Sequence, residues 1–108
     1  MKRRGITEFQ QKVYSATKRI PRGRVTTYGI LARAIGCSSS RAVGQALKRN
    51  PFAPQVPCHR VVSSDLAPGG FIGERKGRSI DRKLRMLWKE GVHFKDGKLA
   101  DPARVFRF

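Results

Sequence analysis

The chain has 108 residues, of which 39% are hydrophobic, so it is long enough to bury one core and too short for a second. It carries a formal net charge of +17 and only two cysteines, and no apolar run approaches the ~20 residues that a membrane span requires. We therefore expect a single cytoplasmic domain over residues 1–108, rather than a membrane protein or a disulfide-stabilised secreted protein.

The basic charge is unevenly distributed along the chain. Residues 1–64 hold 13 Lys and Arg and one acid, whereas residues 65–108 hold 11 Lys and Arg and six acids. A domain with so much self-repulsion usually binds a polyanion, which in the cytoplasm is nucleic acid. Because ribosomal and thermophilic proteins carry a similar excess, the charge indicates a class of partner and no more.

The first elements in chain order are a helix and a short extended piece. Thr7 can cap a helix that has Glu8 in its first turn and that ends at Pro21-Arg22-Gly23. Its apolar residues recur at helical spacing on one face: Phe9, Val13, Ala16 and Ile20. Val25-Thr26 then predicts a short extended segment.

Two further short helices follow. Thr27 can cap a helix from Tyr28 to Ile35 that Gly36 ends, and the serines at 38–40 can cap another that ends near Arg49. The buried side of this last helix consists of small and branched apolar residues: Ala42, Val43, Ala46 and Leu47. Two short helices joined by a tight turn with glycine are typical of a helix-turn-helix.

The second half of the chain predicts a loop, a strand, a helix and a hairpin. Prolines stiffen residues 50–57, residues 59–63 predict a short strand, and residues 64–73 a loop. Ser79 begins a long helix that Gly91 ends, and Asp96-Gly97 is the signature of a tight hairpin. We expect this helix to bury Ile80, Leu84, Leu87 and Trp88. The apolar tail at 104–108 should pack on the body, so the predicted fold is mainly α with minor β, a winged helix-turn-helix-like domain.

The segment with the most evident chemistry is Pro57-Cys58-His59-Arg60-Val61-Val62. A thiol attacks as the thiolate, and an adjacent base or cation lowers a cysteine pKa from its usual ~8.5. In an extended strand His59 and Cys58 point to opposite faces, so a bridging water would carry the proton. A buried structural cysteine is the alternative. The cysteines and histidines lack the spacing of a zinc site, so we predict no metal.

These residues resemble the active-site motif of the O6-alkylguanine-DNA alkyltransferases, also called methylated-DNA–protein-cysteine methyltransferases. The resemblance runs in order over roughly residues 7–94 and corresponds to the C-terminal, DNA-binding and catalytic domain of that family. Other segments that carry it are Val25-Thr26-Thr27-Tyr28-Gly29-Ile30-Leu31-Ala32, Arg41-Ala42-Val43-Gly44-Gln45-Ala46-Leu47, Asn50-Pro51 and Trp88-Lys89-Glu90-Gly91.

The resemblance implies direct repair of double-stranded DNA without a cofactor. A damaged guanine is flipped into a pocket, and the cysteine takes its alkyl group once and irreversibly. Cys58 would be the acceptor, His59 would take its proton through water, and Glu90 would orient His59. Tyr28 would donate a hydrogen bond to the leaving base, and Asn50 would fix the loop that carries the cysteine.

The resemblance also implies a DNA-binding surface and a substrate pocket. Arg41 would fill the space left by the flipped base. The other expected DNA contacts are Thr27, Ser40, Ala42, Gln45 and Arg60, and the expected pocket residues are Val61, Val62, Phe71 and Ile72. Phe71 and Ile72 replace a tyrosine and a small or hydroxyl residue of the family pattern, which puts the substrate range in doubt.

Two other functions remain open. An alkyltransferase-like protein has the same fold and binds O6-alkylguanine without removing the alkyl group, but that group typically has tryptophan or another residue where this chain has Cys58. A winged-helix regulator would account for the charge and leave Cys58, His59 and Glu90 unexplained. Nothing in the sequence requires more than a monomer.

Overall fold

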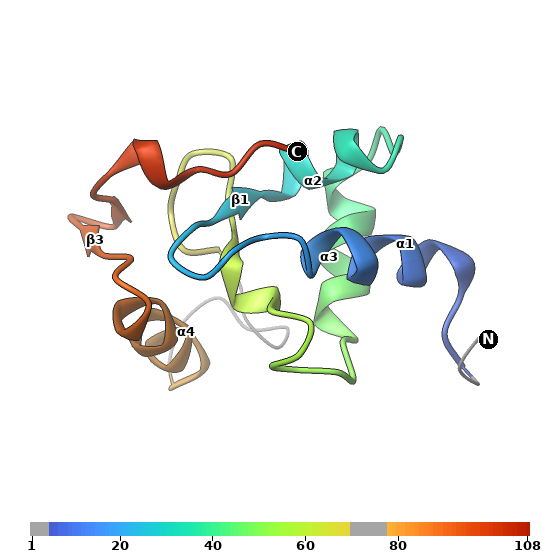
Figure 1. Ribbon diagram of the computed structural model, residues 1–108, viewed down its shortest axis with the longest axis horizontal. Helices are drawn as coiled ribbons and strands as arrows, with labels where there is room; N and C mark the ends of the chain where they lie inside the picture. Colours follow the sequence, from blue (N-terminus) through green and yellow to red (C-terminus); the bar gives the residue numbers. More distant parts are fainter. Residues whose placement is uncertain (1–4, 70–77) are drawn as a thin grey trace.

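The computed structural model describes residues 5–69 and 78–108, and for Arg78 the backbone alone (Figure 1). Within these residues α1 (Glu8–Thr17), α2 (Tyr28–Ala34) and α3 (Ser40–Lys48) lie toward one end of the molecule. Helix α4 (Arg78–Lys89) and the hairpin of β3 (Phe94–Lys95) and β4 (Lys98–Leu99) lie toward the other. No helix of the described residues is long and apolar enough to cross a bilayer.

Local sequence signals set the starts of the first three helices. The Thr7 hydroxyl accepts from the Gln10 N–H, and the Gln10 side chain returns the bond, so α1 begins with a capping box. Thr27 caps α2, as predicted. At α3 the cap is Ser39, whose hydroxyl accepts from Ala42 N–H. Helices α2 and α3 pack on each other and on α1, which gives the predicted helix-turn-helix-like arrangement.

Two parallel strands connect the helix-turn-helix to the second half of the chain. Strand β1 (Thr26–Thr27) pairs with β2 (Val61–Val62) in the register Thr26↔Val61 and Thr27↔Val62. The C-terminal tail joins on the other side of β1, where Val25 bridges Val105 and the Thr26 hydroxyl donates to Phe106 O at 2.9 Å. The tail therefore packs back on the body, as the sequence predicts.

Two predicted details of the second half are wrong. Residues 59–63 do not form one strand, because Arg60 N–H donates to Pro57 O at 2.9 Å and closes a 3₁₀ turn, η1 (Cys58–Arg60), before β2 begins. Trp88 does not face the core either: it is 65% exposed and its ring lies 4.0 Å from that of His93. Lys83 and Leu87, one turn apart on α4, are fully buried.

The hairpin forms as its sequence predicts. Asp96 and Gly97 have φ of +53° and +78°, the left-handed conformation that a two-residue turn of this type requires. Phe94 then pairs with Leu99 across the antiparallel strands, and Leu99 packs in the smaller of two apolar clusters, with Val25, Val62, Leu87 and Val92. The winged part of the domain is thus fixed to β1, β2 and α4.

Candidate active site

Cys58 lies at the first position of η1, directly after the loop of residues 50–57, and its side chain is partly buried. The side chain of Asn50 bonds the backbone of this loop at two points: its Nδ2 donates to Val56 O at 2.9 Å, and its Oδ1 accepts from Phe52 N–H at 2.8 Å. Cys58 N–H also donates to Val56 O. The structure thus places Asn50 where it can hold the cysteine-bearing loop.

His59 and Glu90 meet although 31 residues separate them. His59 Nε2 lies 2.9 Å from Glu90 Oε2, and both side chains are almost completely buried. Arg60 donates two hydrogen bonds of 2.9 Å to the same carboxylate, from Nε to Oε1 and from Nη2 to Oε2. Its Nη1 donates to Ile20 O. Glu90 therefore holds both side chains of η1 that follow the cysteine.

Burial and this carboxylate set the charge states. Burial lowers the pKa of His59, and the charges of Arg60 and Lys83 lower it further, although Glu90 acts in the opposite direction. Burial alone would raise the pKa of Glu90, but the hydrogen bonds from Arg60 and His59 outweigh it and lower that pKa. At neutral pH Glu90 is therefore ionised and His59 is neutral. His59 must be neutral to accept a proton, and an ionised Glu90 can then stabilise the protonated imidazole.

Tyr28 begins α2, immediately after β1. The backbone of Gly69 packs on its ring: a Cβ at this position would lie 3.2 Å from Tyr28 Cε2 and 3.0 Å from Ser63 Oγ, and φ there is +75°. A side chain at 69 would therefore push the ring away. The pairing of β1 with β2 brings Tyr28 to the same region as the residues after η1.

The predicted DNA contacts fall into two groups. Arg41, Ser40 and Gln45 are exposed on α3, and Ala42 is half-buried between them. The other two, Thr27 and Arg60, have partners within the protein: the Thr27 hydroxyl caps α2, and the Arg60 guanidinium bonds Glu90 and Ile20 O. Both side chains already have these internal partners, so the geometry favours structural tasks for them.

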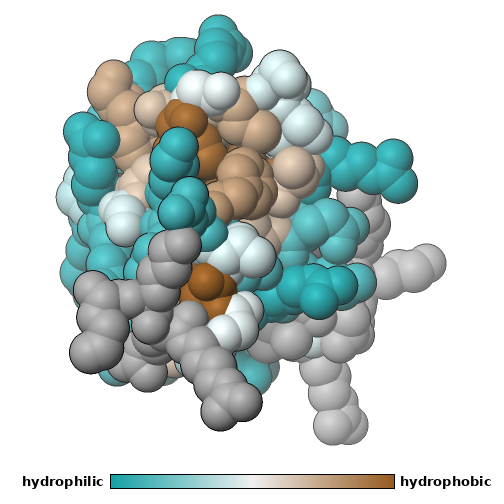
Figure 2. All heavy atoms as spheres, turned by 90° about the vertical axis from the view of Figure 1, so that its right-hand side faces the viewer, coloured by the Kyte–Doolittle hydropathy of each residue, from teal (hydrophilic) through white to brown (hydrophobic). Residues whose placement is uncertain are grey.

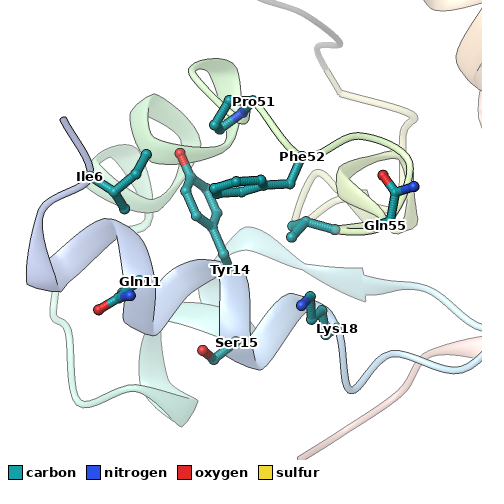
Figure 3. A pocket seen from close by; sticks show the side chains of 9 residues that line it. Ile6, Gln11, Tyr14, Ser15, Lys18, Pro51, Phe52 and Gln55 are labelled. Carbon is teal, nitrogen blue, oxygen red and sulfur yellow. The ribbon is translucent and has the colours of Figure 1, made fainter. Parts of the chain in front are cut away.

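Two of the four predicted pocket residues lie in the described part of the chain. Val61 and Val62 are fully buried and belong to the two apolar clusters. Phe71 and Ile72 lie outside the described residues. A cavity of about 500 Å³ does open between α1 and the loop after α3, with Tyr14 and Phe52 among its lining (Figure 3). None of the predicted site residues lines it.

The surface at this end of the molecule is mixed. Figure 2 shows hydrophilic side chains surrounding a smaller apolar patch on the face that lies to the right in Figure 1, where α1 is placed. The exposed cations of the helix-turn-helix and its end are Arg33, Arg41, Lys48 and Arg49. Such a distribution suits contact with a polyanion better than burial in a protein interface.

One buried residue of the site was missed. Lys83 has no exposed surface and its Nζ donates to Val61 O at 2.7 Å, directly after η1. The sequence of α4 does not show that Lys83 is buried, because a lysine is expected on the solvent-facing side of such a helix. Only the phase of Leu87, one turn later, could have indicated it.

Replacing Arg60 with methionine should raise the pKa of His59. The variant removes one of the cations that lower it and leaves Glu90 to interact with the imidazole alone. An NMR titration of the imidazole resonances measures the change, with Arg33→Met, on the exposed face of α2, as the matched control. A His59 midpoint that stays in place in the Arg60 variant would show that this ion pair does not tune the imidazole.

Comparison with known proteins identifies the family. Residues 8–92 match the family described as 6-O-methylguanine DNA methyltransferase, DNA binding domain. The methylated-DNA–protein-cysteine methyltransferase of Thermococcus kodakarensis is 56% identical over 89 residues, which are 82% of this chain and 47% of that protein. The corresponding protein of Methanothermobacter thermautotrophicus is 43% identical over a similar share. The chain thus spans about half the length of these relatives.

Solved structures agree. The O6-methylguanine-DNA methyltransferase of Pyrococcus kodakaraensis superposes with a TM-score of 0.70 at 47% identity, over 82% of this chain and 48% of that one. Atl1 of S. pombe, solved with damaged DNA containing O6-carboxymethylguanine, superposes with a TM-score of 0.78 at 36% identity, over 94% and 96%. With the fold, the order of the motifs and the family match in agreement, this chain belongs to the O6-methylguanine-DNA methyltransferase family and consists largely of its DNA-binding domain.

Proposed function

We propose that this chain repairs double-stranded DNA by moving the alkyl group of an O6-alkylguanine onto Cys58, once per molecule. The observation that carries the proposal is the hydrogen-bonded set behind the cysteine: His59 follows it directly and lies 2.9 Å from Glu90. Two relatives that are 56% and 55% identical over 82% of this chain are named methylated-DNA–protein-cysteine methyltransferases. We expect the protein to act as a monomer in the cytoplasm.

The chemistry is a single displacement. The Cys58 thiol loses its proton to His59 through a water, the sulfur forms a bond to the alkyl carbon, and the bond from that carbon to O6 breaks. The electron pair of the broken bond stays on the guanine, where the Tyr28 hydroxyl donates to the charge that develops. Because Nε2 of His59 faces Glu90, the proton arrives at Nδ1. The product is a thioether, and no cofactor takes part.

Access to the base requires that it leaves the duplex. Flipping costs a few kcal/mol of unstacking, which a side chain inserted into the gap offsets in part. Arg41 is suited to this task because it is exposed at the second position of α3, and the half-buried Ala42 and Gly44 beside it are small enough to allow close approach to DNA. Ser40 and Gln45 would then contact the backbone beside it.

Intact-mass analysis after incubation with O6-methylguanine duplex tests the proposal. The wild-type protein should gain one methyl group, and Cys58→Ala should gain none. Cys37→Ala is the matched control: this thiol lies in the turn before α3, where it interacts with Ser39, and its removal should leave the gain intact. A wild-type protein that binds the lesion and keeps its mass would contradict alkyl transfer.

Recognition without transfer is the second candidate function, and one observation favours it. Atl1 of S. pombe, solved with damaged DNA, superposes on 94% of this chain with a TM-score of 0.78, whereas the methyltransferase of Pyrococcus kodakaraensis superposes on 82% with a TM-score of 0.70. Under this alternative the chain would bind O6-alkylguanine and mark it for other repair. The mass experiment decides between the two, because tight lesion binding with no methyl gain is the result that marking predicts.

A further inference from the structure

Lys83 is the largest side chain that is completely buried in the described part of the protein. An ammonium group pays a large desolvation penalty in the interior, so a lysine there needs compensating partners and usually has a reason to be present. Its Nζ donates a short hydrogen bond, 2.7 Å, to Val61 O at the start of β2. A methionine or leucine would fill the same space at lower cost, so packing alone does not account for a lysine.

The position of Lys83 relates it to the nucleophile. Lys83 lies within α4, and Glu90 directly follows the last residue of this helix, so that α4, which packs on η1, brings both residues to the same 3₁₀ turn. Glu90 bonds His59 and Arg60, and Lys83 bonds the carbonyl of the next residue, Val61. The segment that follows Cys58 is therefore held at His59 and Arg60 by an acid and at Val61 by a cation.

The pKa of Lys83 depends on Cys58 as well as on burial. Burial lowers the pKa of Lys83 to about 7, and the charge of Cys58 acts against this by raising it. Lys83 also lowers the pKa of His59. The other ionisable group that interacts with Cys58 from a packed element is Tyr14 of α1, whose pKa burial and Cys58 raise and whose neighbour Arg49 acts the other way.

We propose that Lys83 is a positioning residue that stabilises the thiolate of Cys58 and fixes β2 behind it. The assignment rests on the proposed role of Cys58 as the alkyl acceptor. His59 becomes an imidazolium when it takes the proton, but Glu90, 2.9 Å away, offsets that charge, so the thiolate needs a further positive charge nearby. The Lys83 ammonium supplies that charge from a site that water does not reach, where an ion pair is stronger than at the surface.

Alkylation by iodoacetamide tests this without DNA. The reagent forms a bond from sulfur to carbon and releases iodide, and it reads out the thiolate whatever the natural substrate is. In a Cys37→Ala background only Cys58 remains. Lys83→Met should slow alkylation at pH 7 about tenfold or more and move the rise of the rate to higher pH, as loss of a nearby opposite charge requires. Lys89→Met, exposed on the same helix, is the matched control.

A purely structural lysine would give a different result. Lys83→Met would then unfold at a lower temperature and keep the wild-type pH profile of alkylation, which would overturn the proposal. Lys83→Arg restores the charge and should recover part of the rate if it folds. Since the readout needs no DNA, a wild-type protein that takes no methyl group from DNA would refute the proposed function alone.

A second measurement avoids any change at Lys83. NMR titration of its side-chain nitrogen should give a midpoint near 7 in the wild-type protein, and Cys58→Ser should lower that midpoint, because the sulfur charge that opposes deprotonation is gone. The coupling is reciprocal, so equal midpoints in the two proteins would show that the ammonium and the thiolate do not interact.

Discussion

Replacing Glu90 with glutamine should lower the rate of alkyl transfer by a factor of about 10²–10⁴, the range that general acid–base catalysis contributes. Glutamine is uncharged, and it cannot accept from His59 and pair with Arg60 as the carboxylate does. Its amide nitrogen can also face Nε2 and select the wrong tautomer of the imidazole. Single-turnover kinetics on O6-methylguanine duplex measure the loss.

The same variant should also be less stable. Arg60 would be left partly buried without its carboxylate, and the loss of one partner of such a pair costs about 3–5 kcal/mol when the pair is fully buried. Because the folded pKa of Glu90 is lowered, this stabilisation is present above the unfolded pKa of a glutamate and is lost as the pH falls through the folded value. The stability difference between the two proteins should therefore vanish in acid.

Asp81→Asn is the matched control, because this exposed acid lies in the first turn of the same helix. It should transfer at the wild-type rate. Transfer by Glu90→Gln at a rate within threefold of the wild type would show that His59 needs no carboxylate, and the arrangement behind Cys58 would then be structural.

DNA affinity should fall about 150-fold between 50 and 200 mM salt. Each neutralised phosphate contributes about −0.9 to the slope of log K against log salt, and four contacts give a slope of about −3.6. We expect these four contacts to come from the exposed cations of the helix-turn-helix and its end: Arg33, Arg41, Lys48 and Arg49. Titration of a labelled duplex at several salt concentrations measures the slope.

Arg41→Ala should reduce the magnitude of this slope by about one. Lys95→Gln is the control, since Lys95 is exposed in β3, at the other end of the molecule from α3, and should leave the slope unchanged. An affinity that is insensitive to salt, or a slope that Lys95 changes as much as Arg41, would place the DNA elsewhere than on α3.

The sequence predicts local structure well and long-range structure poorly. The caps at Thr7 and Thr27 and the turn at Asp96-Gly97 are confirmed because each depends on residues only a few positions apart. The orientation of Trp88 and the burial of Lys83 were missed, because the phase of α4 is set by what packs against it rather than by its own composition.

The candidate site shows the same division. The residues around Cys58 could be singled out because they are adjacent in sequence, and Glu90 because of a family resemblance. Nothing local could show that Arg60 bonds Glu90 and Ile20 O, since these partners are 30 and 40 residues away. In the sequence alone, an arginine that faces solvent cannot be distinguished from one that, like Arg60, bonds a distant residue inside the protein.

Cys58 and the groups that lie close to η1 come from parts of the chain that are made at different times. Cys58 leaves the ribosome well before Glu90 and Lys83, which reach η1 only when α4 has docked. During synthesis the cysteine is therefore an ordinary thiol, with neither its oriented base nor its buried cation. Under the proposed function, in which each molecule reacts once, this order of synthesis would keep Cys58 from reacting with other electrophiles before α4 is in place.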